Sequence, residues 1–315
     1  MTINCRLLLF AYCDIISAEV SPWYRSGSCR DPFITYLKRG FLSFWFIQSI
    51  KETTVLIIFF IVSFLASVIG AICGIGGGVI IKPVLDMFSL ASVSTISFLS
   101  GCTVLSMSCY SVVKNLAYGE RRVDVKTGTP LAIGAAVGGV AGKQMFSIIK
   151  AMFQDQNTVG VVQALCLALL TVGTLLYTIN KKKIKTHHIT RKSVCLLIGL
   201  VLGILSSFLG IGGGPFNLVI LFFFFSMDTK TAAANSLYII LFSQATSLVT
   251  TLLTHSVPEF EWQTLLLMVC GGIGGGMVGR ALNKKMDNRA VDKLFIGLMV
   301  VIVLICAYNI WKYIN

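Results

Sequence analysis

Eight apolar runs, each long enough to cross a lipid bilayer as a helix, decide what this chain of 315 residues can fold into. The hydrocarbon core of a bilayer is ~30 Å thick, which a helix crosses in about 20 residues. The runs cover approximately residues 53–73, 92–113, 127–147, 159–179, 194–210, 231–253, 262–280 and 293–312. Two further apolar stretches, 79–89 and 215–226, follow the first and fifth runs, and each is too short to cross alone.

The composition supports a membrane protein and excludes two other classes. Charged residues make up 12% of the chain and hydrophobic residues 56%, with a mean hydropathy of +0.84. A soluble domain carries about 25% charged residues, and a disordered chain combines low hydrophobicity with high charge. We therefore predict an all-α polytopic membrane protein.

The net charge of +13 does not indicate nucleic-acid binding. Lysine and arginine fall mainly between the apolar runs, and six of them lie within residues 181–192. This distribution is typical of membrane topology signals. No nucleic-acid partner is predicted.

Residues 1–52 do not share the pattern of long apolar runs. Charged residues interrupt every apolar stretch before it reaches spanning length, and no signal peptide with a small-residue cleavage site is visible. We expect a poorly defined N-terminal extension, with a surface helix around residues 41–50 or no fixed structure.

An internal repeat organises the remainder of the chain. The pentapeptide Gly74–Gly78 recurs letter for letter as Gly210–Gly214, at an offset of 136 residues. Glycines 134, 138 and 142 recur as 271, 275 and 279, at an offset of 137. We predict two four-helix repeats, at 53–180 and 194–315, joined by a basic linker at 181–193. Transporters often contain such duplications, with the substrate near the midplane where the halves meet.

The direction of the two repeats stays open at this point. Four crossings in each half would make the repeats parallel, whereas additional crossings by the short stretches would make them inverted. Basic loops at 114–126 and 180–193 favour a cytoplasmic location for both loops and for the termini of an eight-crossing chain. The same scheme places the basic residues of 280–293 outside, against the rule.

Each pentapeptide ends in three consecutive glycines inside membrane-depth sequence. Each glycine is ~1 kcal/mol less favourable than alanine in a helix, so both segments are predicted to break the first helix of their repeat. A half-helix starting at the break directs free N–H groups and its positive dipole end toward it, which suits an anion. The alternative is that the glycines only permit close helix packing. The candidate anion-binding glycines are Gly76, Gly77, Gly78, Gly212, Gly213 and Gly214.

Polar side chains in the runs supply the remaining site candidates, because intramembrane polarity usually faces a pathway. Lys82 and Asp86 are four residues apart and share a helix face. The lysine either neutralises an anionic substrate or forms a structural pair with Asp86. Hydroxyl and amide groups add Ser100, Asn217, Asn235 and Ser236, although such residues also bind helices together.

The spacing of glycines in the stripes 134–142 and 271–279 is typical of membrane helices that approach one another closely. We expect these two helices to form a tight core between the repeats. A dinucleotide-binding letter pattern at 274–279 is rejected because no strand precedes it.

The two glycine segments and their surroundings resemble the TauE/SafE family of sulfite exporters. The most specific matches are Gly70–Leu85, Gly210–Asn217 and Ala232–Ser236, together with an acidic residue, Asp124 or Glu261, before each glycine-striped helix. The resemblance covers about 53–312 and implies an eight-helix plasma-membrane carrier for sulfite, sulfonates or other small organic anions. It also implies coupling to ions or protons without ATP. The extra 50 residues at the N-terminus depart from the family and suggest a misassigned start codon.

We therefore predict a secondary transporter whose partners are a small anionic solute and the lipid bilayer. A non-transporting membrane scaffold or assembly factor is the alternative, and an intramembrane enzyme is disfavoured because no acid, base or metal cluster is evident. No cofactor is predicted, and a homo-oligomer is left open.

Overall fold

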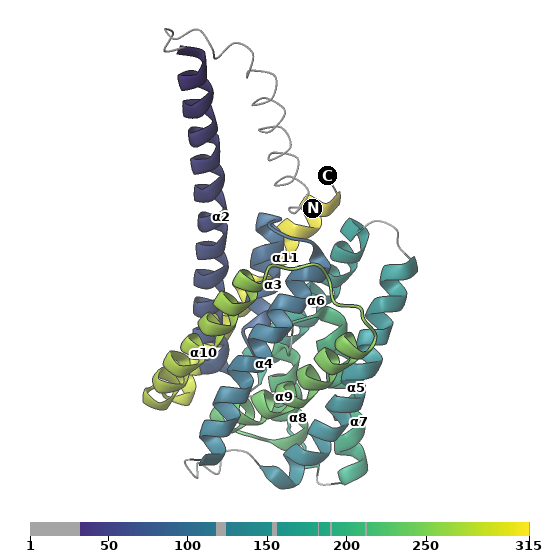
Figure 1. Ribbon diagram of the computed structural model, residues 1–315. Coiled ribbons are helices and arrows are strands. Elements are labelled where there is room, and N and C mark those ends of the chain that lie inside the picture. Colours follow the sequence, from purple (N-terminus) through teal and green to yellow (C-terminus); the bar gives the residue numbers. More distant parts are fainter. Residues whose placement is uncertain are drawn as a thin grey trace. The chain divides into compact units, whose positions relative to one another are not determined.

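The computed structural model describes residues 32–117, 124–152, 156–181, 183–189, 191–211 and 213–314. Residues 53–315 form one compact unit, and residues 1–52 are assigned to another. The described residues form ten α-helices and no strand. These helices are α2 (Pro32–Cys73), α3 (Gly78–Phe88), α4 (Val93–Ala117), α5 (Val125–Met152), α6 (Gln156–Asn180), α7 (Lys192–Leu209), α8 (Pro215–Phe225), α9 (Thr229–Leu253), α10 (Trp262–Lys285) and α11 (Asn288–Ile314) (Figure 1).

The eight long apolar runs are confirmed as helices. All eight are long and apolar enough to cross a membrane, and α8 is a shorter apolar helix. The helix α2 begins at Pro32, so the surface helix expected around residues 41–50 is instead part of α2. Residues 1–31 lie outside the described residues.

The short helix α3 returns to the end of the unit where α2 begins. Val55, near the start of the described unit, packs in the same apolar cluster as Phe260. Lys312 donates a hydrogen bond to the carbonyl of Met87 at the end of α3, at 2.6 Å. Thr95 at the start of α4 donates to the carbonyl of Glu259, at 3.0 Å. We name this side of the unit the Glu259 end.

The short helix α8 returns toward the opposite side. The N–H of His187 donates to the carbonyl of Phe223 at the end of α8, at 2.7 Å. Lys181 forms an ion pair with Asp292 near the start of α11, and Thr229 at the start of α9 donates to the same carboxylate, at 2.9 Å. We name this side the linker end.

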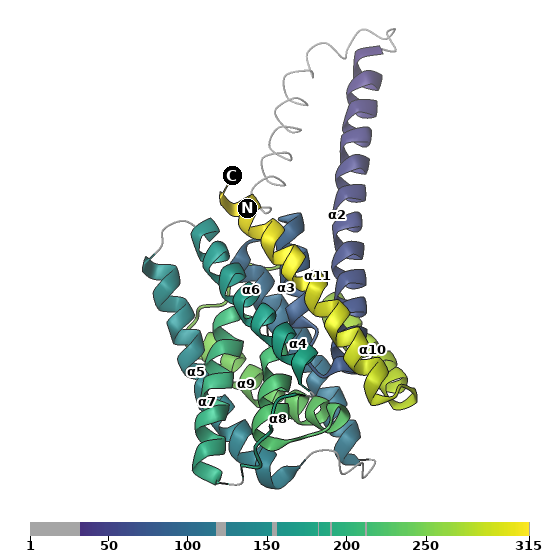
Figure 2. The same ribbon diagram turned by 180° about the vertical axis from the view of Figure 1, so that it is seen from behind.

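Helix α11 separates the two ends. Asp292 lies at the linker end and Lys312 at the Glu259 end, and the intervening helical residues span about 30 Å at 1.5 Å per residue. That length matches the thickness of the bilayer core. The half-helices α3 and α8 therefore point to opposite membrane faces, and the two halves run in opposite directions (Figures 1 and 2).

This inverted arrangement corrects the expected position of the basic segment 280–293. The ion pair between Lys181 and Asp292 places the start of α11 at the linker end, beside the basic linker. An arrangement with eight full crossings places these segments on opposite sides. The physical reason for the difference is that α3 and α8 turn back, so each half changes the side of the chain only through its last three helices.

Glycine is required where the broken segments press on the other half. Gly74 has φ +76° and no room for a Cβ atom against the backbone of Ala233 in α9. Gly210 has φ +64° and meets the side chain of Ser97 in α4. A positive φ is unfavourable for residues with a side chain. The two contacts are related by the same offset of 136 residues that relates the pentapeptides.

The glycine stripes hold the two halves together, as predicted. In α5, Gly134 and Gly138 lie against the carbonyl groups of Leu196 and Leu200 in α7. In α10, Gly275 lies in the same way against Phe64 of α2. Each stripe therefore packs on the first helix of the opposite half, where the absence of side chains allows close backbone approach.

Candidate substrate site

The two broken segments meet inside the unit. Gly78, the first residue of α3, lies against the carbonyl of Ile211 in the second segment. A Cβ atom on Gly213 would lie 3.4 Å from the carbonyl oxygen of Ile75 in the first segment. Ile75 and Ile211 are fully buried. The breaks thus face each other as predicted, but their point of contact is packed and apolar.

The N-terminal start of α3 retains free donors. Among the described residues, the N–H groups of Gly77 and Gly78 form no backbone hydrogen bond. Gly76 (φ +74°) lies near Val104 of α4 and Ile240 of α9. Gly212 lies outside the described residues, and Gly214 directly precedes α8. Anion binding by these glycines remains a prediction.

A polar cavity of about 420 Å³, counting the open space at its mouth, adjoins the second break. We name it the Lys143 cavity. Among the described residues that line it, Lys143 is the only charged side chain and none is acidic. Its lining residues are Ser97, Phe98, Gly101, Cys102, Lys143, Phe146, Gln163, Ser207, Phe208, Gly210, Gln244, Ser247, Leu248 and Thr251.

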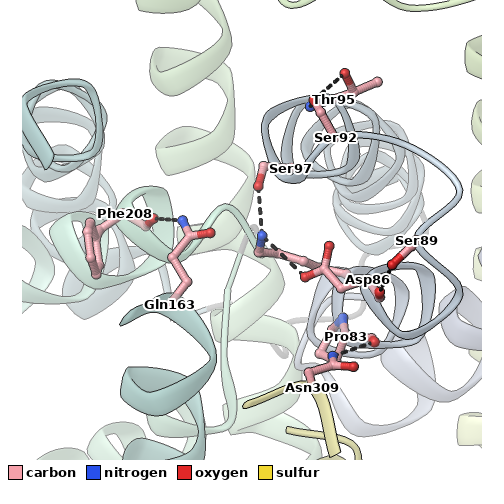
Figure 3. Close-up of polar contacts among 10 residues, drawn as sticks. Pro83, Asp86, Ser89, Ser92, Thr95, Ser97, Gln163, Phe208 and Asn309 are labelled. Carbon is pink, nitrogen blue, oxygen red and sulfur yellow. Dashed lines mark hydrogen bonds and ion pairs between the residues drawn. The ribbon is translucent and has the colours of Figure 1, made fainter. Parts of the chain in front are cut away.

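Lys82 lies directly behind the wall of this cavity. Its ammonium donates a hydrogen bond to Ser97 Oγ at 2.9 Å and is 3.6 Å from a carboxylate oxygen of Asp86. Both charged residues are buried. Figure 3 shows Ser97 on one side of this contact and Asp86 on the other. The predicted pairing of Lys82 with Asp86 is confirmed, and Ser97 links the pair to the cavity.

A smaller cavity of about 260 Å³ lies on the other side of Lys82. Gln163 of α6 lines both this cavity and the Lys143 cavity. Its amide donates to the carbonyl of Phe208 at 2.7 Å, and Asn309 donates to the carbonyl of Pro83 at 2.8 Å (Figure 3). The side-chain oxygens of Gln163 and Asn309 have no hydrogen-bond partner among the described residues. A buried lysine is therefore surrounded by polar groups with unused hydrogen-bonding capacity.

Three further predicted residues are buried without polar partners. The hydroxyl groups of Ser100 and Ser236 and the side-chain oxygen of Asn217 have none among the described residues. Ser100 lies near Gly78 at the junction of the breaks. Buried polar groups without partners are uncommon in folded proteins, so these groups remain candidates for contact with a solute or water.

Asn235 has a structural contact that the sequence did not suggest. Its side-chain oxygen accepts a hydrogen bond from the N–H of Asp124 at 3.1 Å, and its amide donates to the carbonyl of Thr231 at 2.9 Å. Asn235 therefore holds the start of α5 against α9. Substrate binding by Asn235 remains a prediction.

The sequence reasoning missed Lys143, Gln163 and Ser97 as site residues. Lys143 was visible only as the match of Arg280 in the repeat, and Gln163 is a single amide in an apolar run. Ser97 lies on the helix face that meets the opposite half, which no single-helix pattern reveals. The matched pair of basic residues was the signal that could have identified this cavity.

These features define a class of protein. Helices of spanning length, two broken helices that meet at their breaks, and a polar cavity beside them are typical of a multi-pass membrane transporter. Within the described residues, no three His, Cys, Asp or Glu side chains gather where they could hold a metal ion.

Comparison with known proteins is consistent with this class. Residues 59–305 match the family described as Sulfite exporter TauE/SafE, so the chain belongs to this family. It is 25% identical over 282 residues to the "Probable membrane transporter protein YunE" of Bacillus subtilis (strain 168), a match that covers 81% of this chain and 97% of that protein. No solved structure matches the chain. The chain is a multi-pass membrane transporter, and the plasma membrane is its expected location.

Proposed function

We propose that the protein is a secondary transporter that moves small oxyanions, with sulfite and sulfonates as the best candidates, and that it catalyses no chemical reaction. The proposal takes the repeats at 53–180 and 194–315 as the two moving halves and 181–193 as the linker. Inverted halves of this kind allow a solute to be reached alternately from either face.

The observation that carries the proposal is the lining of the Lys143 cavity. One ammonium group, several hydroxyl groups and two amides face a cavity that has no acidic residue among its described lining. An anion gains from the positive charge and from hydrogen-bond donors, whereas a metal cation finds no carboxylate ligand there. The lining therefore favours a small oxyanion.

Lys82 gives this cavity a second positive charge at greater depth. Because Ser97 lines the cavity and also accepts the hydrogen bond from Lys82, rotation of its hydroxyl group can donate to a bound anion while its oxygen faces the ammonium. We propose that Lys82 attracts the anion through Ser97 and that Asp86 keeps the lysine in place. Charged residues at membrane depth usually serve a transport path.

Uptake of radiolabelled sulfite into proteoliposomes tests the proposal. We expect saturable flux in the wild type and at least a tenfold lower kcat/KM in Lys143→Met, with substantial recovery in Lys143→Arg. Lys150→Met is the matched control, because Lys150 is exposed on the same helix and does not line the cavity. Sulfonates are tested by their inhibition of sulfite flux. Absence of flux for sulfite, sulfonates and other small oxyanions would overturn the proposal.

A further inference from the structure

A second polar cavity lies toward the linker end of the unit. It has a volume of about 400 Å³, counting the open space at its mouth, and we name it the Arg280 cavity. Lys230 and Lys284 also line it, and Lys284 is exposed. Among the described residues that line it, three are basic and none is acidic.

The Arg280 cavity and the Lys143 cavity are built from equivalent positions of the repeat. Eight of its ten described lining residues match residues of the Lys143 cavity at an offset of 136 or 137. Arg280 corresponds to Lys143, Asn115 to Thr251, and Ser111 to Ser247. Because the halves are inverted, equivalent positions occur at opposite membrane depths. Independent surface hollows would have no reason to show this correspondence.

Helices α4 and α9 each pass both cavities. On α9, Ala233 to Leu237 line the Arg280 cavity, whereas Ser247 to Thr251 line the Lys143 cavity. The centres of these segments are separated by about 20 Å at 1.5 Å per residue. On α4, which runs in the opposite direction, the order is reversed. The two cavities therefore lie near opposite faces of one bilayer core.

The packed junction of the glycine breaks separates the cavities. Gly210 belongs to the wall of the Lys143 cavity, and Ala71, which precedes the first break, belongs to the wall of the Arg280 cavity. Gly74 is pressed against Ala233 and Gly210 against Ser97. The same contacts that need glycine thus close the path between the two cavities.

We propose that the Arg280 cavity is a second anion-binding site, at the cytoplasmic face, and that Arg280 receives there the same small oxyanion that Lys143 receives at the outer face. This inference rests on the proposed function and adds a binding site and its orientation. The basic residues of 181–192 and 284–293 gather at the linker end, and an excess of Lys and Arg marks the cytoplasmic side. The expectation of cytoplasmic termini is replaced, because α11 ends on the other side.

Arg280 also has a contact that a purely structural residue would have. Its guanidinium donates to the carbonyl of Ser111 at 3.1 Å, which ties α10 to α4. A structural role alone predicts an equal effect on transport from both sides. An anion-receiving role predicts a weaker apparent affinity on the cytoplasmic side only.

Sulfite uptake into right-side-out and inside-out membrane vesicles separates these alternatives. For Arg280→Met we expect at least a tenfold higher KM for sulfite presented at the cytoplasmic face, with less than a twofold change for the outer face. Lys143→Met is expected to show the opposite asymmetry, and Arg280→Lys to recover most of the affinity. Lys285→Met is the control, because Lys285 is exposed on the same helix and outside the cavity.

The possible failures are distinguishable. Wild-type vesicles without flux of sulfite, sulfonates or other oxyanions would overturn the proposed function and this inference with it. Wild-type flux combined with an unchanged or symmetric KM in Arg280→Met would overturn only this inference. If Arg280→Met does not reach the membrane, Asn115→Leu provides the second test, with the same cytoplasmic-side increase expected and the same symmetric result counting against the site.

Discussion

Gly78 and the carbonyl oxygen of Ile211 are in direct contact, although the two residues belong to different broken helices. A Cβ atom on Gly78 would overlap that carbonyl group. The contact joins the start of α3 to the second break, so it couples the position of one half-helix to the other. Any motion that opens a path between the two cavities has to separate these residues.

The replacement Gly78→Ala tests how tightly this junction is packed. The added methyl group meets backbone and cannot rotate away, so we expect a destabilisation of about 1–3 kcal/mol, typical of overpacked sites. Sulfite flux is expected to fall at least tenfold. Thermal unfolding in detergent and vesicle flux provide the two measurements.

Gly173→Ala is the matched control for this variant. Gly173 lies inside α6, and a Cβ atom there has no neighbour within 4 Å. Alanine is favoured over glycine in helices by about 0.5–1 kcal/mol, so an unchanged or slightly higher melting temperature is expected. Equal stability and flux of the two variants would show that the junction is not tightly packed.

The pairing of Lys82 with Asp86 gives a prediction that separates stability from transport. Removing one member leaves an uncompensated buried charge, so Lys82→Met alone should lower the free energy of unfolding by about 3–5 kcal/mol. The second half has Leu218 and Phe222 at the equivalent positions, which shows that apolar residues suit this place in the fold. The double variant Lys82→Met/Asp86→Leu should therefore recover most of the stability.

Transport should not recover in that double variant, because the proposed attraction of the anion needs the ammonium group. Chemical unfolding in detergent and sulfite flux are compared for the wild type, both single variants and the double variant. A double variant that is stable and transports at the wild-type rate would assign the pair to structure alone.

The glycine stripe of α5 makes a different prediction. Gly138 lies against the carbonyl of Leu200 in α7, so Gly138→Ile has to push the two helices apart. We expect aggregation or a clearly lower melting temperature in size-exclusion and thermal unfolding experiments. The same replacement at Gly297, which has no neighbour within 4 Å of a Cβ atom, should leave the melting temperature within a few degrees. A stable Gly138→Ile variant would contradict the close approach of α5 and α7.

The sequence contained enough information to predict the helices, the two breaks and the tight glycine packing. Spanning length, triple glycines and small-residue spacing are local properties, and each one decides a local structure. It did not reveal that α3 and α8 turn back, because the direction of a half-helix after a break depends on contacts such as that between Lys312 and Met87. For the same reason the sequence could not show that Ser97, Gln163 and Lys143 share one cavity, since they lie on three helices.

Membrane topology provides the last test, because the inverted arrangement assigns a side to each connecting segment. The segments around His187 and Met286 are both at the linker end, whereas Ser256 lies in the segment next to Glu259 at the other end. Reporter insertions into the full-length chain at these three positions should make fluorescent protein fluoresce at 187 and 286, and alkaline phosphatase active at 256. The proposed orientation follows from the basic residues at the linker end. Only insertions that preserve sulfite flux or the melting temperature are scored, and opposite sides for 187 and 286 would contradict the return of α8 toward the linker end.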